Sequence, residues 1–364
     1  MNAWLLSLQF VLCAALIARA GWVLSRSGDR IAALTGLSGG WVGLALLATA
    51  TSLPELASGV SAVALLQAPN LAVGNALGAC VFNLLCLAVV DMLQRQEPLY
   101  RRASDEHLLS AAFGVVMLGL VAMAVLMAQT LPSLLHVGVY SPVLLGLYLL
   151  ALRSVHARQR HPTGRRDSGS SPPPGARSAS PGAPDVADVA AAPEAGPADV
   201  AAPQATTLAA EWRRFTLAAA MVLAAGIWLS HLADELAQAA GWNRSFVGTL
   251  FMALVTTLPE VAVTLSALRM GAIDMAIGNL LGSNLFNVAI LAIDDAAYVQ
   301  RALLADASTA HAGTAMAAVV MTGLVIVGLV MRPRGRVLRL ASWVSIGVAA
   351  TYVLAATLVF VRGG

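Results

Sequence analysis

Charged residues are scarce in this 364-residue chain: they make up 11% of it, and none of them is lysine. A soluble domain carries about a quarter charged residues, whereas 58% of this sequence is hydrophobic. The net charge of +3 is not concentrated enough to suggest a nucleic-acid binder, and we expect no nucleic-acid partner. The apolar residues occur in long blocks, which indicates a polytopic membrane protein rather than a soluble core.

Cysteine is equally rare. Cys13, Cys80 and Cys86 all fall inside apolar blocks, and nothing about them resembles a disulfide framework or a zinc site. The first apolar block has no positive segment before it and no small-residue cleavage site after it, so we expect a retained helix rather than a signal peptide. No Ser/His pair lies at a plausible depth, so the sequence does not favour an enzyme, and we expect no catalytic residues and no cofactor.

Ten apolar segments are long enough to cross a bilayer, which takes about 20 residues per helix. We expect an all-α integral membrane protein with spans at 4–24, 41–66, 71–93, 108–129, 134–152, 214–233, 246–268, 274–293, 311–331 and 337–361. The stretch between the fifth and sixth spans holds nine of the 16 prolines and cannot bury enough apolar surface to fold. The predicted organisation is therefore a first membrane half (1–153), a disordered cytoplasmic linker (154–212) and a second membrane half (213–364).

The arginines predict the orientation. With the N-terminus outside, 19 of the 22 arginines fall on the cytoplasmic side, and only Arg244, Arg301 and Arg362 lie outside. The positive-inside rule predicts this partition, and the opposite orientation would violate it. We therefore expect a multi-pass protein of the cell membrane with both termini outside and the linker in the cytoplasm.

The two halves of the chain match each other. The segment "TSLPELASGVSA" at 51–62 aligns with "TTLPEVAVTLSA" at 256–267, and "AVGNALGACVFN" at 72–83 aligns with "AIGNLLGSNLFN" at 276–287. Because each half has five spans, an odd number, equivalent segments enter the membrane from opposite sides. An inverted repeat with a proline-interrupted helix in each copy predicts a transporter whose binding site lies near the middle of the bilayer.

Two acids lie well inside the predicted spans, and they occupy matching positions, Glu55 and Glu260. The other acids near the spans are expected at helix ends, where water is near: Asp91, Asp274, Asp294 and Asp295. A charge at the bilayer centre costs about 2.5–3.5 kcal/mol, and no arginine lies at a comparable depth. We therefore expect the two glutamates to be protonated or to be neutralised by a bound cation.

Hydroxyl side chains stand three and four residues before each glutamate, on the same helical face. They belong to Thr51, Ser52, Thr256 and Thr257. Pro54 and Pro259 should also free backbone carbonyls one turn earlier. Carboxylates, hydroxyls and carbonyls are hard oxygen ligands that suit calcium or sodium and do not suit zinc or copper. The alternative for Ser52 and Thr257 is that they only patch the proline kink.

The next helix of each repeat supplies amide oxygens. Asn75 and Asn83 are eight residues apart, as are Asn279 and Asn287, so each pair falls roughly on one helical stripe. The glycines between them form G-x-x-x-G, whose expected role is close helix packing. That packing would bring the asparagine stripe against the glutamate turn.

At these motifs the chain resembles the sodium/calcium exchanger family of the cation/calcium antiporter superfamily, with alpha repeats at about 41–93 and 246–293. The resemblance implies a ten-helix fold and a cation site lined by Thr51, Ser52, Glu55 and Asn83 from one half and by Thr256, Thr257, Glu260, Ser283 and Asn287 from the other. Backbone carbonyls near Ala48 and Ala253 would add ligands. This chain departs from the family pattern at Ala79, where a serine is expected, and at Cys80, where an asparagine is expected.

Two carboxylates in one cavity would be neutralised by one divalent ion, two monovalent ions or two protons. The sequence therefore favours a secondary antiporter that exchanges calcium for sodium by alternating access, with small inorganic cations and membrane lipid as its partners. A calcium or other cation/proton antiporter of the same superfamily is the alternative, and a cation channel is a more distant one. His107 and His311 match across the repeats at helix mouths, where we expect interfacial polar residues, with pH sensing as the alternative.

Overall fold

The computed structural model describes residues 3–35, 48–94, 97–160, 207–269, 271–333, 335–337 and 341–362. In the first half the elements are α1 (Ala3–Leu34), α3 (Leu53–Ala64), α4 (Pro69–Leu93), α5 (Leu99–Arg102), α6 (His107–Leu126), the strands β1 (Ser133–Leu134) and β2 (Val137–Gly138), and α7 (Tyr140–Arg160). In the second half they are α8 (Leu208–Ala240), α9 (Arg244–Phe246), the π-helical turn η1 (Val247–Met252), α10 (Ala253–Thr256), α11 (Leu258–Arg269), α12 (Ile273–Ala297), α13 (Leu303–Asp306), α14 (Ala310–Met331) and α15 (Trp343–Arg362).

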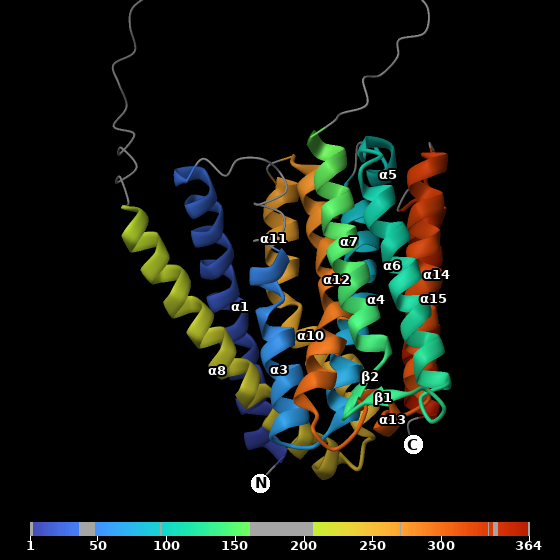
Figure 1. Cartoon of the computed structure of the whole chain (residues 1–364). Helices are drawn as coiled ribbons and strands as arrows, with labels where there is room; N and C mark the ends of the chain where they lie inside the picture. Colours follow the sequence, from blue (N-terminus) through green and yellow to red (C-terminus); the bar gives the residue numbers. More distant parts are fainter. Residues whose placement is uncertain are drawn as a thin grey trace, which may run out of the picture.

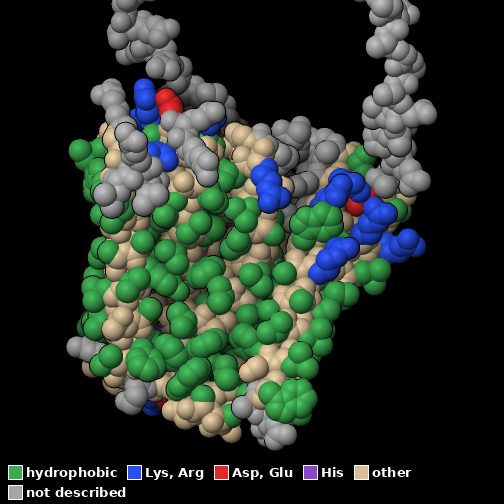
Figure 2. Space-filling model, turned by 180° about the vertical axis from the view of Figure 1, so that it is seen from behind, with side chains coloured by type: hydrophobic (Ala, Val, Ile, Leu, Met, Phe, Trp, Pro, Cys, Tyr) green, Lys and Arg blue, Asp and Glu red, His purple; other side chains and the backbone are tan. Residues whose placement is uncertain are grey.

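The long helices run roughly along one direction and form a single bundle, with both chain termini at the same end (Figure 1). Seven of the described helices are long and apolar enough to cross a membrane, and the bent pair Arg244–Thr256 and Leu258–Arg269 makes an eighth if it counts as one broken span. Figure 2 shows a broad apolar face with most of its visible arginine side chains gathered at one end. The all-helical membrane fold predicted from the sequence is therefore confirmed.

Several predicted boundaries differ from the structure. The fifth span begins at Tyr140 rather than at 134, because residues 133–138 form the antiparallel β1–β2 hairpin. The tenth begins at Trp343 rather than at 337. The stretch predicted as linker is helical at both ends, since α7 runs to Arg160 and α8 starts at Leu208. Hydropathy identifies the part of a helix that lies in the lipid, whereas backbone hydrogen bonds can extend the same helix beyond the lipid into water. Residues 36–47 and 161–206, on which parts of the predicted second span and linker fall, lie outside the described residues.

The helices α4 and α12 form the centre of the bundle. In their most apolar windows 72% and 89% of residues are buried, against 28% in α1 and α15. Each central helix packs against the broken span of its own half and against its counterpart in the other half. The outermost pair, α1 and α8, pack against each other at one side (Figure 1). The two G-x-x-x-G helices therefore meet near the middle of the molecule, where the glutamate turns also lie.

Glycines allow the broken spans to be approached closely. A Cβ on Gly78 of α4 would collide with the carbonyl oxygen of Thr249 in η1, and a Cβ on Gly74 would lie 3.0 Å from the carbonyl oxygen of Ser245. The expected packing role is therefore confirmed for these two glycines. In the second copy the contact is looser, because a Cβ on Gly282 would lie an ordinary 3.5 Å from the Cβ of Ala48.

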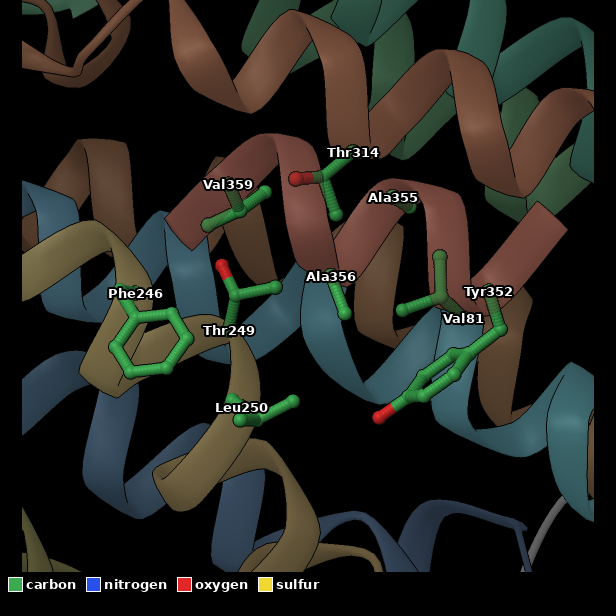
Figure 3. A pocket seen from close by; sticks show the side chains of 9 residues that line it. All are labelled: Val81, Phe246, Thr249, Leu250, Thr314, Tyr352, Ala355, Ala356 and Val359. Atoms are coloured by element: carbon green, nitrogen blue, oxygen red, sulfur yellow. The ribbon is translucent and has the colours of Figure 1, made fainter. Parts of the chain in front are cut away.

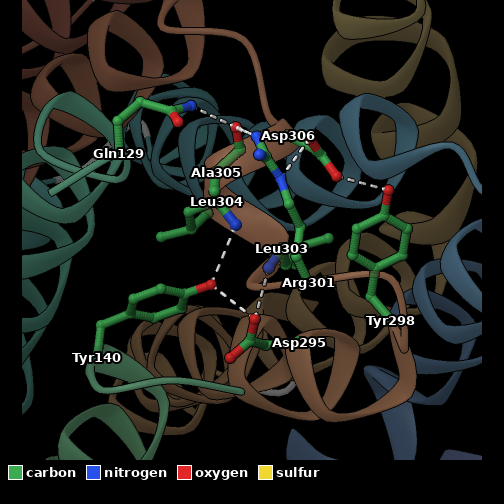
Figure 4. Close-up of polar contacts among 9 residues, drawn as sticks. All are labelled: Gln129, Tyr140, Asp295, Tyr298, Arg301, Leu303, Leu304, Ala305 and Asp306. Atoms are coloured by element: carbon green, nitrogen blue, oxygen red, sulfur yellow. Dashed lines mark hydrogen bonds and ion pairs between the residues drawn. The ribbon is translucent and has the colours of Figure 1, made fainter. Parts of the chain in front are cut away.

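Two matching aspartates anchor the ends of the central helices. Asp295 of α12 accepts hydrogen bonds from the backbone N–H of Leu303 (2.6 Å) and from the Tyr140 hydroxyl (2.7 Å) (Figure 4). It also accepts from the backbone N–H of Gly138 (2.8 Å) and from Ser141. It thereby ties the α12–α13 turn to the start of α7.

Asp91 of α4 does the same in the first half. Its carboxylate accepts from the backbone N–H groups of Leu99 and Ser342 and from the Ser345 hydroxyl, at 2.8–2.9 Å. The side chains of Asp91, Asp294 and Asp295 are all fully buried. The expectation that these three acids lie near water was wrong, because short segments such as α5 and α13 fold back over the helix ends and exclude it.

Candidate functional site

Both glutamates lie in the first turn of a helix that begins directly after a break. Pro54 occupies the first turn of α3, where its missing N–H is not needed, and Pro259 has the same place in α11. The residues just before these helices leave the helical region: Ser52 has φ −90° and ψ 11°, and Thr257 has φ −81° and ψ 0°. In the second copy the two helical pieces differ in direction by 44°. Both glutamate side chains are therefore buried in the first turn after a break.

All nine side chains predicted to line the site are fully buried. Among the described residues, neither Glu55 nor Glu260 forms an ion pair with an arginine or a histidine. No three residues of the His, Cys, Asp and Glu types converge on one point in the described part of the chain. The arrangement therefore consists of two carboxylates among neutral oxygen donors, a donor set that suits hard cations.

At the glutamate turns two hydroxyls donate across the halves: Thr256 Oγ1 to Asn75 Oδ1 at 3.1 Å and Ser52 Oγ to Glu260 Oε1 at 2.8 Å. The counterpart of Ser52 does not reach the other glutamate, because Thr257 Oγ1 donates to the carbonyl oxygen of Ala253 at 2.8 Å. For Thr257 the alternative of patching the proline kink is therefore the one the geometry favours, whereas for Ser52 it is not. Thr51 Oγ1 donates to the Ala48 carbonyl at 3.2 Å.

The carbonyl oxygens of Ala48 and Ala253 already accept hydrogen bonds from the chain. That of Ala48 accepts from the Ser52 N–H and the Thr51 hydroxyl, and that of Ala253 accepts from the Thr257 N–H and from two threonine hydroxyls. A carbonyl has two lone pairs, so both are largely occupied. Ligation by these carbonyls would require the threonine hydroxyls to turn away.

Two asparagines that the sequence placed on the stripe hold the backbone of the glutamates. Asn75 Nδ2 donates to the carbonyl oxygen of Glu55 (3.3 Å) and to Ser58 Oγ (3.0 Å). Asn279 Nδ2 donates in the same way to the carbonyl oxygen of Glu260, at 3.3 Å. Neither asparagine was among the predicted ligands. Their contacts indicate that they position the two glutamates. The signal for this pair was their identical place in both repeats.

Asn284 is a residue that the sequence reasoning missed. Its Nδ2 donates to the carbonyl oxygen of Cys80 at 3.2 Å, and its Oδ1 accepts from Asn83 Nδ2 at 3.1 Å. It joins α4 to α12 and orients the amide of Asn83. The matching residue in the first half is Cys80, whose thiol makes only a weak 3.7 Å contact with the Asn284 carbonyl.

Several buried polar atoms of the predicted site have no hydrogen-bond partner. They are Glu55 Oε1 and Oε2, Glu260 Oε2, Asn83 Oδ1, Ser283 Oγ, and Asn287 Oδ1 and Nδ2. Buried polar atoms are nearly always paired in folded proteins. Six of these seven atoms are oxygens, two side chains bring negative charge, and all come from residues that the repeat analysis had selected. A bound cation would satisfy such a set of oxygens.

A separate small pocket lies between α4, η1, α14 and α15 (Figure 3). Its volume of about 10 Å³ is enough for one water. Thr249 and Thr314 line it with hydroxyls that have no partner, and its other lining residues are apolar apart from Tyr352. No acid lines it, so it is not the cation site.

The two histidines are buried and make equivalent contacts in the two halves. His107 Nε2 lies 2.9 Å from Asp274 Oδ1, and His311 Nε2 lies 3.2 Å from Asn70 Oδ1. The same two oxygens accept from the backbone N–H groups of Ser104 and Ser308. Both histidines lie at the start of a helix, as expected. Their contacts join the two halves of the protein, so they do not simply face the interface with water.

Comparison with known proteins agrees with this arrangement. The family described as "Sodium/calcium exchanger protein" matches residues 5–154 and 212–361. The chain belongs to the sodium/calcium exchanger family. That family consists of membrane transporters rather than enzymes.

Individual relatives are similar over shorter stretches or at low identity. The putative antiporter CaxA of Alkalimonas amylolytica is 35% identical over 97 residues, and the sodium/calcium exchanger MaX1 of Methanosarcina acetivorans is 40% identical over 55. These stretches are 26% and 15% of this chain and 30% and 16% of those proteins, so the chain matches under a third of either relative's length.

Solved structures share the fold over nearly the whole chain. The sodium-calcium exchanger NCX_Mj soaked with Na⁺ and Sr²⁺ gives a TM-score of 0.58 at 19% identity, covering 97% of this chain and 98% of that one. The H⁺/Ca²⁺ exchanger CAX gives 0.60 at 15% identity, covering 98% and 88%. At these identities the likeness concerns the fold alone.

Proposed function

We propose that this protein is a secondary antiporter that exchanges calcium for sodium at a site between the two glutamate turns. The observation that carries the proposal is the set of buried oxygens without a hydrogen-bond partner on Glu55, Glu260 and the residues around them. All of these residues lie at positions that the repeat matches. The proposed ligands are the side chains of Thr51, Ser52, Glu55, Asn83, Thr256, Glu260, Ser283 and Asn287. Thr257, the ninth residue predicted for the site, instead donates to the carbonyl of Ala253 at the proline kink. One calcium ion would neutralise both carboxylates.

Exchange follows from the charge of this site. With both carboxylates ionised and no cation bound, two negative charges would be buried without a partner, which is costly. Loading by a divalent ion or by two monovalent ions removes that charge. Because only the loaded, low-charge site switches readily between the two faces, movement of one ion class would depend on return of the other.

Proton coupling is the second candidate, and a specific observation favours it. Ala79 removes a hydroxyl opposite Ser283, so the site has fewer oxygens with which to hold several sodium ions. Two protons on Glu55 and Glu260 would neutralise it equally well. The same residues would then serve calcium/proton exchange.

The proposal includes a placement in the membrane. With most arginines on the cytoplasmic side, both termini would lie outside the cell membrane. The linker predicted at 154–212 would then lie in the cytoplasm between the two membrane halves.

Purified full-length protein in liposomes tests the function. Sodium, potassium and pH gradients are imposed one at a time, and uptake of radioactive calcium is followed. Sodium-driven uptake that is lost in both Glu55→Gln and Glu260→Gln, and retained in the exposed control Glu97→Gln, supports the proposal. Uptake driven by a pH gradient without sodium selects the second candidate. Saturation-free flux without any counter-ion would indicate a channel and overturn both.

A further inference from the structure

A buried carboxyl without a hydrogen-bond partner also lies outside the proposed cation site. Asp294 of α12 has no exposed surface, and neither of its carboxylate oxygens has a hydrogen-bond partner. Its neighbour Asp295 is equally buried but accepts four hydrogen bonds. Asp295 therefore has an architectural explanation, and Asp294 has none.

The position of Asp294 is defined by two helices. It follows Asn287 by seven residues, so both lie on one face of α12, about 10 Å apart along the helix axis. Its carboxylate packs against Gly59 of α3, where a Cβ would lie 2.6 Å from Oδ2. Gly59 itself is one helical turn beyond Glu55. The carboxyl thus sits in the seam between α3 and α12, close to the C-terminal end of α12. That end of α12 lies at the end of the bundle where both chain termini are found (Figure 1).

The repeat shows that the fold does not require this acid. The positions that match Asp294 and Gly59 in the other half are Val90 and Thr264. Asp295, in contrast, is matched by Asp91, which makes the equivalent helix-end contacts. The seam between α3 and α12 therefore contains an acid and a glycine that the matching seam in the other half lacks. The acid is specific to one side of the protein.

The surroundings favour a proton as its occupant. The titratable groups on the elements around it are Asp295 and Tyr298 at the end of α12, Glu55 on α3, Tyr140 on α7, and His136, whose Nε2 contacts the carbonyl of Ala296. No cation among the described residues pairs with Asp294, and no hydroxyl or amide reaches its oxygens. A metal ion needs several oxygen ligands, whereas a proton needs only this carboxyl.

We propose that Asp294 is a proton-binding site on the limb of the ion pathway that leads toward the termini. It holds a proton while α3 and α12 are packed together, because an unpartnered ionised carboxylate is costly to bury. When the seam opens and water enters, the proton is released to that side. This gating role rests on the proposed antiport, whereas the proton site itself does not.

Infrared difference spectroscopy of the purified full-length protein tests the site without transport. The background is Glu55→Gln/Glu260→Gln, which removes both site carboxyls. We expect the C=O band of a protonated carboxylic acid to persist in this background and to be lost on adding Asp294→Asn, with Glu97→Gln as the unaffected control. A band unchanged by Asp294→Asn overturns the proposal. If Asp294→Asn does not fold, Gly59→Ser places a hydroxyl beside the carboxyl, and the band must shift.

A transport measurement tests the gating role separately. In liposomes of known orientation, pH is varied on each side in turn. Asp294→Asn should flatten the pH profile on the side of the termini and leave the profile on the other side unchanged. An unaltered profile on the side of the termini overturns the gating role. If wild-type protein transports nothing under any gradient, the proposed function fails, while the infrared result still decides the proton site.

Discussion

The hydroxyl of Ser52 donates a 2.8 Å hydrogen bond to the Glu260 carboxylate, and so joins the glutamate turn of one half to that of the other. The matching hydroxyl of Thr257 bonds within its own helix, to the carbonyl of Ala253. Glu260 therefore has a fixed donor, whereas both carboxylate oxygens of Glu55 have none. The two glutamates are equivalent by sequence and unequal in their contacts.

Ser52→Ala should weaken cation binding more than Thr257→Ala does. A hydrogen bond to a charged group contributes about 1.5–3 kcal/mol, which corresponds to a roughly tenfold or greater rise in the half-saturating calcium concentration. Thr257→Ala removes only a bond within one helix, and we expect a change of less than about threefold. Calcium uptake into liposomes at a series of concentrations measures both. Equal effects of the two substitutions would contradict an unequal pair of glutamates.

Gly78→Ala should destabilise the protein, and Gly282→Ala should not. The Cβ in α4 collides with the backbone carbonyl of Thr249, which has no flexible end to move aside, and overpacking of this kind costs about 1–3 kcal/mol. The Cβ in α12 meets only the Cβ of Ala48 at 3.5 Å. Thermal unfolding in detergent compares the two matched variants. A lower melting temperature for Gly282→Ala than for Gly78→Ala would mean that the close approach is wrongly assigned.

Asp295→Asn should lower stability by at least about 2 kcal/mol, because an amide can accept at only one of its two ends and hydrogen bonds to the charged group are lost. The matched control is Glu97→Gln, which breaks an exposed ion pair with Arg101 and should change stability by about 0.5 kcal/mol or less. Denaturation followed by tryptophan fluorescence gives both values. Wild-type stability in Asp295→Asn would contradict an anchoring role.

Ala79→Ser should tighten cation binding, because it restores a hydroxyl at the position that matches Ser283. One neutral ligand contributes about 1 kcal/mol, or roughly fivefold in affinity. The double variant Ala79→Ser/Ser283→Ala keeps the number of hydroxyls and moves one of them to the other half. Isothermal titration of calcium and sodium distinguishes the cases. A weaker affinity in Ala79→Ser would show that the position does not face the ion.

The repeat made much of this arrangement predictable. Alignment of the repeat segments, together with the resemblance to the exchanger family, selected nine side chains, all of which the structure buries. The ten predicted spans each overlap a described helix, because a bilayer imposes a minimum apolar length on any helix that crosses it. The repeat showed that Asn75 and Asn279 occupy matching positions, but it did not show which atoms their side chains contact.

Other features could not be read from the sequence. Whether Asp91 meets water or three donors depends on α5 and the start of α15, and hydropathy says nothing about which segments cover a helix end. The unequal roles of Ser52 and Thr257 were also hidden, since both carry a hydroxyl at the same position before a proline. Asn284 was missed because its partner in the other half, Cys80, breaks the symmetry on which the search relied.

The one-sided bond between Ser52 and Glu260 also bears on where the empty protein rests. In a transporter built from two inverted halves, exchanging the conformations of the halves converts the inward-open form into the outward-open form. With identical halves these two forms would be related by a two-fold rotation and would have equal free energy. The halves are not identical here, because the bond from Ser52 to Glu260 would be replaced in the other form by one from Thr257 to Glu55. A free-energy difference of about 1.5 kcal/mol between these two bonds would populate one form roughly tenfold over the other. The empty protein would then expose its site mainly to one side of the membrane, even with no ion gradient.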